Sequence, residues 1–262
     1  MIDIHSHILP DVDDGARTLE EALEMARIAF ADGIQQMCCT PHMFNGISDN
    51  PEPPEILDRV AALQEAIGAA GLRVLPGNEV HVSHEIAEQA KNNRVTKLNQ
   101  KNYMLVEFPT MTIPVGADEL FYRLQVNGVR PILVHPERNS QMQARPSLVA
   151  DFVERGVYVQ VTAMSVTGEF GQAAKTCADS LLRHNCVHFL ATDCHRTERR
   201  APILSRGRDA AAAIIGAEKA QKLVWDNPLA VVTGGVIQAD APISYSGPAA
   251  KKSSFFGKLF GR

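Results

Sequence analysis

Two histidines one residue apart, His5 and His7, stand near the start of the chain. Ile2 and Ile4 alternate with polar residues there, which predicts a short strand with one buried face. Side chains on a strand repeat every second position, so His5 and His7 would share a face. Two imidazoles on one face suit a metal site. A single His-x-His pair also arises by chance on surfaces, so the interpretation depends on the other strands.

Six of the seven strands that the sequence predicts end in a histidine or a carboxylate. The remaining strand offers only Gln160 and Thr162. Chance placement would spread such residues evenly over strands and loops, so their concentration favours one shared site. The candidate ligands, with Asp14 from the first loop, are His5, His7, Asp14, His42, Glu79, Glu107, His135, Asp193 and His195.

These five histidines and four carboxylates are too many for one metal, which takes about four to six ligands. They suit two or three divalent ions bridged by a carboxylate. Mixed imidazole and carboxylate ligands favour manganese, iron or zinc over calcium. Metals a few ångströms apart promote in-line displacement at phosphorus, with a bridging hydroxide as the nucleophile.

A phosphate also needs cations, and two arginines follow ligand positions. Arg138 comes after His135, and Arg200 comes after His195. A guanidinium group binds phosphate oxygens bidentately. Arg199 is the alternative to Arg200, and a solvated loop charge is the alternative role for each arginine.

Seven strand–helix units in strict alternation would position these residues. Strict alternation predicts a parallel sheet, and no Gly-x-Gly-x-x-Gly motif follows the first strand, so a barrel is favoured over a dinucleotide-binding sheet. In such a barrel the strand ends lie on one face, where active sites form. After the first strand, the predicted strands cover residues 34–39, 72–76, 103–107, 131–135, 157–161 and 187–193. The predicted helices cover residues 18–32, 52–70, 85–91, 118–126, 147–155, 171–184 and 203–225.

Composition sets the class of protein. The 262 residues, 45% of them hydrophobic, suit one large α/β domain, which we place at residues 1–237. A net charge of −4 argues against a nucleic-acid binder. Five scattered cysteines, with Cys38 and Cys39 adjacent, predict reduced thiols and a cytoplasmic location. A candidate ligand at residue 5 leaves no room for a signal peptide, and no apolar run reaches the ~20 residues of a spanning helix.

A cysteine-dependent phosphatase is an alternative, because a Cys-x5-Arg pattern occurs twice. Cys177 precedes Arg183, and Cys194 precedes Arg200. That mechanism needs a loop of converging N–H groups and a lowered thiol pKa. Cys177 falls within a predicted helix, and Cys194 follows Asp193, whose charge raises a thiol pKa. We therefore disfavour this mechanism.

The end of the chain, residues 238–262, differs in composition. Residues 238–250 are rich in Ala, Pro, Ser and Gly and predict a flexible linker. Residues 251–262 are basic and aromatic, which suits contact with an anionic membrane surface or a membrane-associated partner. A frayed or locally packed terminus is the simpler interpretation.

The motifs that carry the ligands resemble the PHP superfamily of metal-dependent phosphoesterases. Within it they resemble the bacterial tyrosine-protein phosphatases of capsule and exopolysaccharide gene clusters. The resemblance covers roughly residues 1–235, in the expected order. It rests on Asp3–Pro10 with Asp13–Ala16, and on Thr40–His42, Gly77–Glu79, His135–Arg138 and Thr192–His195.

The resemblance implies a distorted seven-stranded (β/α) TIM-like barrel, the PHP fold, with a trinuclear site that usually holds manganese. It also implies removal of phosphate from phosphotyrosine in the cognate tyrosine autokinase of polysaccharide export, a membrane-associated protein. The enzyme would then be cytoplasmic or peripheral at the inner membrane face. Neither the partner nor the oligomeric state follows from the sequence.

Carried over residue by residue, the resemblance implies three metal positions. Glu79 would bridge the first two, and Asp13 is the alternative to Asp14. Arg138 and Arg200 match the phosphate-binding arginines of the family. Cys194 departs from the small residue common there, which affects local packing. The implied ligand sets are His5, His7, Glu79 and Asp193 for the first metal, Glu79, Glu107 and His135 for the second, and Asp14, His42 and His195 for the third.

We therefore predict hydrolysis of phosphotyrosine. Its leaving group has a conjugate-acid pKa near ~10, so no dedicated general acid is required. A PHP phosphatase for a small phosphomonoester, such as histidinol phosphate, would share every ligand. A non-catalytic, metal-binding regulatory subunit is a further alternative. A metal-dependent amide or ester hydrolase would leave the arginines without a role.

Overall fold

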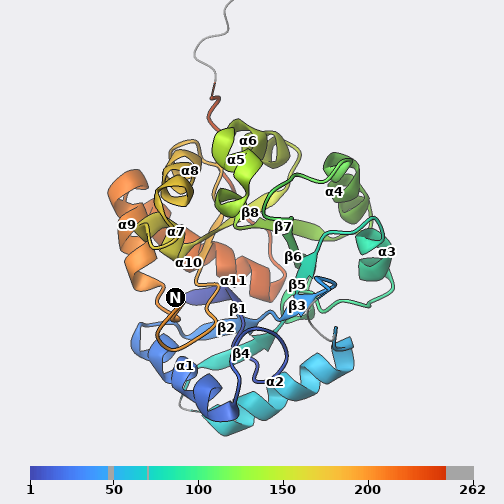
Figure 1. Cartoon of the computed structure of the whole chain (residues 1–262), viewed down its shortest axis with the longest axis vertical. Helices are drawn as coiled ribbons and strands as arrows, with labels where there is room; N and C mark the ends of the chain where they lie inside the picture. Colours follow the sequence, from blue (N-terminus) through green and yellow to red (C-terminus); the bar gives the residue numbers. More distant parts are fainter. Residues whose placement is uncertain (47–49, 70, 246–262) are drawn as a thin grey trace, which may run out of the picture.

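The computed structural model describes residues 1–46, 50–69 and 71–245. Its centre is a set of parallel strands in two sheets (Figure 1). The smaller sheet has the order β1 (Ile2–Ser6), β2 (Gln36–Cys39) and β4 (Arg73–Pro76). The larger sheet has the order β3 (His42–Met43), β5 (Glu79–His81), β6 (Tyr103–Glu107), β7 (Arg130–Val134), β8 (Tyr158–Thr162) and β9 (Phe189–Ala191).

Two predicted strands, 34–39 and 72–76, are β2 and β4, and each is followed after a two-residue break by a short strand that the sequence did not predict. Thr40 and Pro41 separate β2 from β3, and Pro41 has no N–H to donate to a strand ladder. Gly77 and Asn78 separate β4 from β5. A Cβ atom on Gly77 would lie 2.8 Å from Leu98 Cδ2, so this close turn requires glycine. The breaks move His42 and Glu79 from the smaller sheet to the larger one.

A bridge between Ser6 and Cys194 joins β1 to the segment after β9. With each broken pair taken as one strand, the chain forms a distorted ring of seven parallel strands. This confirms the predicted α/β barrel. All strand ends that carry candidate ligands therefore meet on one face.

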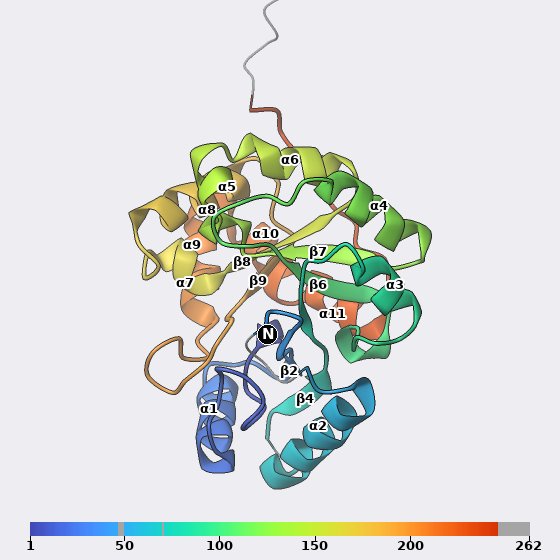
Figure 2. The ribbon, with the colours of Figure 1, turned by 45° about the vertical axis from the view of Figure 1, so that its right-hand side comes forward.

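Helices cover the outside of the strands. In Figures 1 and 2, α1 (Leu19–Ala31) and α2 (Pro53–Ile67) lie beside β2 and β4. The other helices surround the larger sheet. They are α3 (Ile86–Lys91), α4 (Ala117–Val126), α5 (Ser140–Ala144), α6 (Ser147–Glu154), α7 (Ala163–Thr167), α8 (Gln172–Arg183), α9 (Ser205–Ile215), α10 (Ala217–Val224) and α11 (Asp226–Thr233), with the 3-10 turns η1 (Leu98–Gln100) and η2 (Pro136–Arg138).

The predicted capping of the first helix is correct. The Glu21 backbone N–H donates to Thr18 Oγ1 over 3.2 Å, and the Arg17 N–H donates to the Glu21 carboxylate over 2.9 Å. Gly33 ends the helix with a φ of 92°. The helices predicted within residues 203–225 are α9 and α10, which Gly216 separates with a φ of 88°. The sequence pattern did not predict α5, α7 or α11.

The barrel interior is filled by apolar side chains from both sheets, among them Ile4, Leu105 and Phe189. Val231 of α11 packs against this cluster and closes the end of the barrel away from the ligands. Both faces of the strands are covered, which explains their nearly continuous apolar runs. The core gives the strand ends a rigid support.

The first residues of the predicted linker lie against α8. The Ile243 N–H donates to the His184 carbonyl over 2.8 Å, and the Tyr245 ring stacks on His184 with centroids 3.7 Å apart. The remainder of the predicted tail, residues 246–262, lies outside the described residues. Among the described helices, none is long and apolar enough to cross a bilayer.

A buried histidine at the start of β9 predicts a pH effect on stability. Burial lowers the pKa of His188 to about 4, and its Nδ1 accepts the Val159 N–H over 3.0 Å. The unfolded chain, with a histidine pKa near ~6.5, binds more protons between these values, so the fold loses stability as the pH falls. For His188→Asn, which keeps an acceptor, we expect that loss to shrink by roughly 3 kcal/mol between pH 7 and pH 4. Denaturant titrations measure it. His84→Asn, an exposed site, is the control, and parallel curves for wild type and His188→Asn would contradict the prediction.

Candidate metal centre

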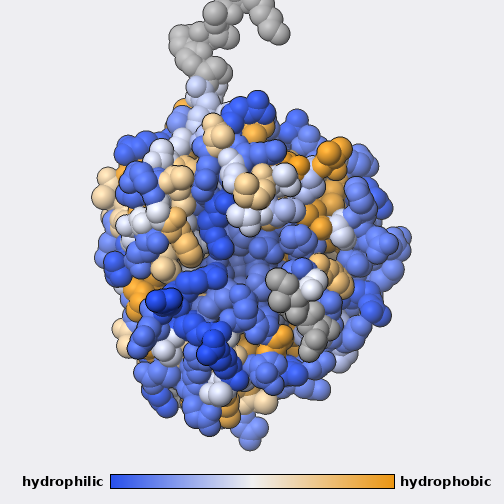
Figure 3. Space-filling model, in the orientation of Figure 1, coloured by the Kyte–Doolittle hydropathy of each residue, from blue (hydrophilic) through white to orange (hydrophobic). Residues whose placement is uncertain are grey.

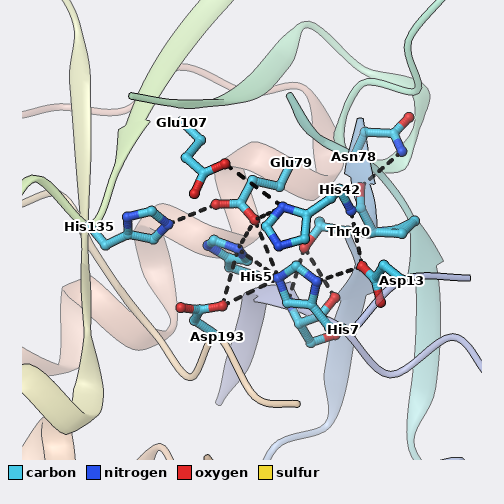
Figure 4. Close-up of polar contacts among 12 residues, drawn as sticks. His5, His7, Asp13, Thr40, His42, Asn78, Glu79, Glu107, His135 and Asp193 are labelled. Carbon is cyan, nitrogen blue, oxygen red and sulfur yellow. Dashed lines mark hydrogen bonds and ion pairs between the residues drawn. The ribbon is translucent and has the colours of Figure 1, made fainter. Parts of the chain in front are cut away.

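The nine predicted ligands meet at the carboxyl ends of the strands. Six of them are buried, and His42, Glu107 and Asp14 are increasingly exposed, with side-chain exposures of 15%, 20% and 57%. Figure 4 shows the rings of His5, His7, His42 and His135 around Glu79. Figure 3 shows a largely hydrophilic surface in the middle of the face seen in Figure 1.

His5 and His7 lie side by side, as the strand alternation predicts. Their Nε2 atoms are 3.3 Å apart. Each lies 3.3 Å from Glu79 Oε2, and they lie 3.5 and 3.3 Å from Asp193 Oδ1. Ligand atoms around a tetrahedral metal with bonds near ~2.1 Å stand about 3.4 Å apart. His5, His7 and Asp193 therefore have the spacing of a shared ion, and Glu79 Oε2 lies 3.3 Å from both imidazoles.

Glu79 lies at the centre of the cluster. Besides His5 and His7, its Oε2 lies 2.9 Å from His42 Nδ1, while Oε1 lies 2.7 Å from His135 Nε2. Its two oxygens thus face different imidazoles. This is the arrangement of a carboxylate that bridges two metals.

Asp14 lies at the outer edge, between two histidines. Its Oδ1 is 3.5 Å from His42 Nε2 and 3.3 Å from His195 Nε2. Burial and the charge of His7 lower the pKa of His195 to about 4, so this ring is neutral and has a lone pair for a metal.

Four groups of ligand atoms, each within 4.8 Å of one another, form among the described residues. Together they contain all nine predicted ligands. The grouping differs from the implied one. Glu79 groups with His5 and His135 and not with His7 and Asp193, Glu107 groups with His42 and not with His135, and His7 joins the Asp14 group. The groups are His7, Asp14, His42 and His195; His5, His7 and Asp193; His5, Glu79 and His135; and His42, Glu79 and Glu107.

Two buried atoms of the cluster support metal binding. His42 Nδ1 and Glu79 Oε2 have no hydrogen-bond partner among the described residues, although they lie 2.9 Å apart. Buried polar atoms without partners are costly, so their presence calls for an ion. Imidazole and carboxylate ligands fit manganese, iron or zinc.

The histidines and carboxylates of the cluster shift one another's pKa values. Burial lowers the pKa of His7, but nearby carboxylates, Asp13 first, outweigh burial and hold this pKa well above its usual value. Burial raises the pKa of Glu79, but His5 and His42 outweigh it and hold the pKa well below the usual value. The site therefore retains bound cations, which are protons until metals replace them.

Two residues that the sequence analysis did not assign as ligands orient the histidines. Asp13 Oδ2 lies 2.7 Å from His7 Nδ1, and Gln160 Oε1 lies 2.9 Å from His5 Nδ1. Each oxygen accepts the Nδ1 proton and leaves Nε2 free for a metal. Asp13 thus lies behind His7, whereas Asp14 faces the ligand groups. Gln160 lies on β8, the one predicted strand that ends without a histidine or carboxylate, and its polar side chain was the only sequence signal for this role.

A glycine brings the first loop to His7. A Cβ atom on Gly15 would lie 2.0 Å from the His7 carbonyl oxygen, and the Ala16 N–H donates to that oxygen over 3.0 Å. Gly15 N–H also donates to Asp13 Oδ1 over 2.9 Å. The tight loop places both Asp13 and Asp14 beside the strand-end ligands.

The two predicted arginines meet at Asp193. Arg138 Nη1 and Arg200 Nη2 lie 2.6 and 2.5 Å from Asp193 Oδ2, the oxygen that turns away from His5 and His7. Arg200 Nε is buried without a partner among the described residues, so it remains free to donate. Asp193 and Arg200 have φ values of 51° and 57°, a strained conformation that is common at functional sites. Arg199 is exposed.

The cysteines do not suit nucleophilic catalysis. All five are buried, and burial raises the pKa of both Cys177 and Cys194 to about 12. A thiolate would be scarce at neutral pH. The structure thus agrees with the choice of metal chemistry.

Comparison with known proteins also points to metal-dependent phosphatases. The chain is 39% identical over 202 residues to the tyrosine-protein phosphatase YwqE of Bacillus subtilis, which covers 76% of this chain and 79% of that protein. It is 28% identical over 244 residues to the tyrosine-protein phosphatase CpsB of Streptococcus pneumoniae, or 90% and 100% of the two chains. A solved structure from work on these two proteins, described there as unique metal-dependent tyrosine phosphatases, superimposes with a TM-score of 0.88 at 34% identity, over 94% of this chain and all of that one.

More distant structures share the fold alone. The phosphotriesterase of Mycobacterium tuberculosis superimposes with a TM-score of 0.53 at 10% identity, over 90% of this chain and 95% of that one. The family model for capsular polysaccharide synthesis, CpsB/CapC, matches residues 1–233. The resemblance inferred from the motifs is thereby confirmed, and the chain belongs to the CpsB/CapC family.

Proposed function

We propose that this chain is a metal-dependent tyrosine-protein phosphatase of capsule synthesis. The observation that carries the proposal is the pairing of Arg138 and Arg200 on Asp193, whose other oxygen faces the histidine cluster. Phosphate-binding cations and metal ligands thus share one carboxylate. The names of the two relatives described above, both tyrosine-protein phosphatases, support this function.

The site would bind two or three divalent metal ions, with manganese as the metal. The nine residues described above would hold them. When bound, such ions supply a water-derived nucleophile at neutral pH and neutralise charge on the phosphoryl group. Glu79 would bridge two of them. We place the activity in residues 1–237.

The arginines would hold the phosphate for in-line attack. Arg200 Nε and the Nη atoms of both arginines not used by Asp193 offer donors for the phosphate oxygens. Both guanidinium groups stay charged at every pH of interest, so they stabilise negative charge as it develops. A tyrosinate leaves readily, with a conjugate-acid pKa near ~10, so the site needs no general acid.

The substrate is then a phosphotyrosyl protein. Within capsule synthesis we propose the membrane-associated tyrosine autokinase as the physiological partner. A small phosphomonoester such as histidinol phosphate would use the same ligands. Rates on the two substrates distinguish these functions.

Substrate and metal dependence test the proposal together. We expect the chain to hydrolyse a phosphotyrosyl peptide far faster than histidinol phosphate, to lose activity in a chelator, and to regain it with Mn²⁺. Phosphate release against measured metal content checks this. Preference for histidinol phosphate would replace the proposed substrate, and full activity without metal would reject the mechanism.

Loss of single ligands should abolish turnover. For His42→Ala and His135→Ala we expect a fall in kcat of at least about 10²-fold together with lower metal content, because each ring faces Glu79. Metal analysis and steady-state kinetics measure both. His84→Ala, at an exposed site, is the matched control. A ligand variant with full activity would remove that residue from the centre.

The arginine pair gives a separate test. We expect Arg138→Lys and Arg200→Lys each to lower kcat/KM by roughly 10²-fold with metal content unchanged, because lysine cannot reproduce the bidentate geometry. Arg199→Lys, next in the chain but exposed, should behave as wild type. A larger defect in Arg199→Lys than in Arg200→Lys would reverse the assignment.

A further inference from the structure

Phe170 lies against both arginines of the site. The Arg138 Cζ atom is 4.9 Å from the centre of its ring, and the Arg200 Cζ atom is 5.7 Å from it. A guanidinium group within about 6 Å of an aromatic face is attracted by the ring's negative face. One ring thus contacts two cations.

The two guanidinium groups stand next to each other, because both bond the same oxygen of Asp193. Two like charges at this separation repel, and one carboxylate oxygen balances only part of that charge. The face of Phe170 supplies a second attraction without offering a hydrogen-bond acceptor. It therefore holds the arginines while leaving their remaining N–H groups for a ligand.

Two glycines and backbone hydrogen bonds define the turn that carries Phe170. It lies between α7 and α8, where Gly168 and Gly171 have φ values of 93° and 89°. The Gly168 and Glu169 N–H groups both donate to the Met164 carbonyl, over 3.1 and 2.9 Å. The ring is only half-buried and belongs to neither of the core clusters found in the described residues. Core packing does not explain its position.

The segment with Arg138 is tied to the same helix. Glu137, fully buried, accepts the Thr162 N–H over 3.0 Å and the Ser165 hydroxyl over 2.6 Å. These bonds join η2 to the start of α7. The segments that carry Arg138 and Phe170 are therefore linked through α7.

The segment after Arg200 is tied to α7 as well. Gly207 of α9 packs so closely that a Cβ atom there would lie 2.5 Å from Ala163 Cβ. Arg206 forms an ion pair of 3.1 Å with Glu169, the neighbour of Phe170. The segments that carry Arg138, Phe170 and Arg200 are thus connected through α7 and the turn that follows it.

We propose that Phe170 is a positioning residue that holds Arg138 and Arg200 in place to receive the phosphate group. The inference rests on the proposed function, since it assigns these arginines to phosphate. It concerns how the phosphate is held and not the tyrosine ring. Its effect should therefore appear with any phosphate ligand.

Binding of inorganic phosphate to the manganese-loaded chain, followed by calorimetry, tests the proposal. We expect Phe170→Leu to weaken phosphate binding and to raise KM for a phosphotyrosyl peptide, each by roughly tenfold, with manganese content and kcat close to wild type. Phe170→Tyr, which keeps the aromatic face, should restore both within about twofold. Phe30→Leu, at an exposed site on α1, is the matched control and should change neither.

The other outcomes overturn the proposal. Unchanged phosphate affinity in Phe170→Leu would show that the ring does not act on the arginines, and a raised KM alone would assign it to the tyrosine ring. Lower manganese content in the variant would indicate a structural role. Absence of phosphotyrosine turnover by the wild type contradicts the proposed function separately, because phosphate binding is measured without turnover.

Discussion

The structure depends on the compensation of buried charge around Glu79. Its carboxylate is 1% exposed and lies within 3.3 Å of the imidazoles of His5, His7, His42 and His135. A buried, ionised carboxylate without cations costs several kcal/mol, a large share of the stability of a domain, so the surrounding residues supply positive charge. Imidazoles with Nε2 or Nδ1 aimed inward do this with protons or with metals. The site is thus a requirement of the fold once Glu79 is buried.

Asp193 takes part in the same charge compensation and links the histidines to the two arginines. One oxygen faces His5 and His7, and the other bonds Arg138 and Arg200. The proposed metal ligands and the proposed phosphate-binding arginines are therefore coupled through one side chain. With the proposed roles, a change in metal occupancy would alter the charge around the arginines, and bound phosphate would alter the charge around the metals.

The strand breaks place two of the ligand candidates, His42 and Glu79, in the larger sheet. The interruptions at Thr40–Pro41 and Gly77–Asn78 pass the chain from the smaller sheet to the larger one. His42 and Glu79, each the first residue of the new strand, then pair in register. This places Glu79 Oε1 2.7 Å from His135 Nε2.

The sequence by itself determined the alternation of strands and helices and the identity of the nine ligand candidates, because parallel strands place their ends on one face. It also carried the family, through short motifs in a constant order. Only the tertiary structure decided that Asp13 supports His7 while Asp14 faces the metal groups, that Gln160 orients His5, and that Phe170 contacts both arginines. These roles depend on contacts between residues far apart in the chain, such as His5 and Gln160, which are 155 positions apart, and no local pattern records them.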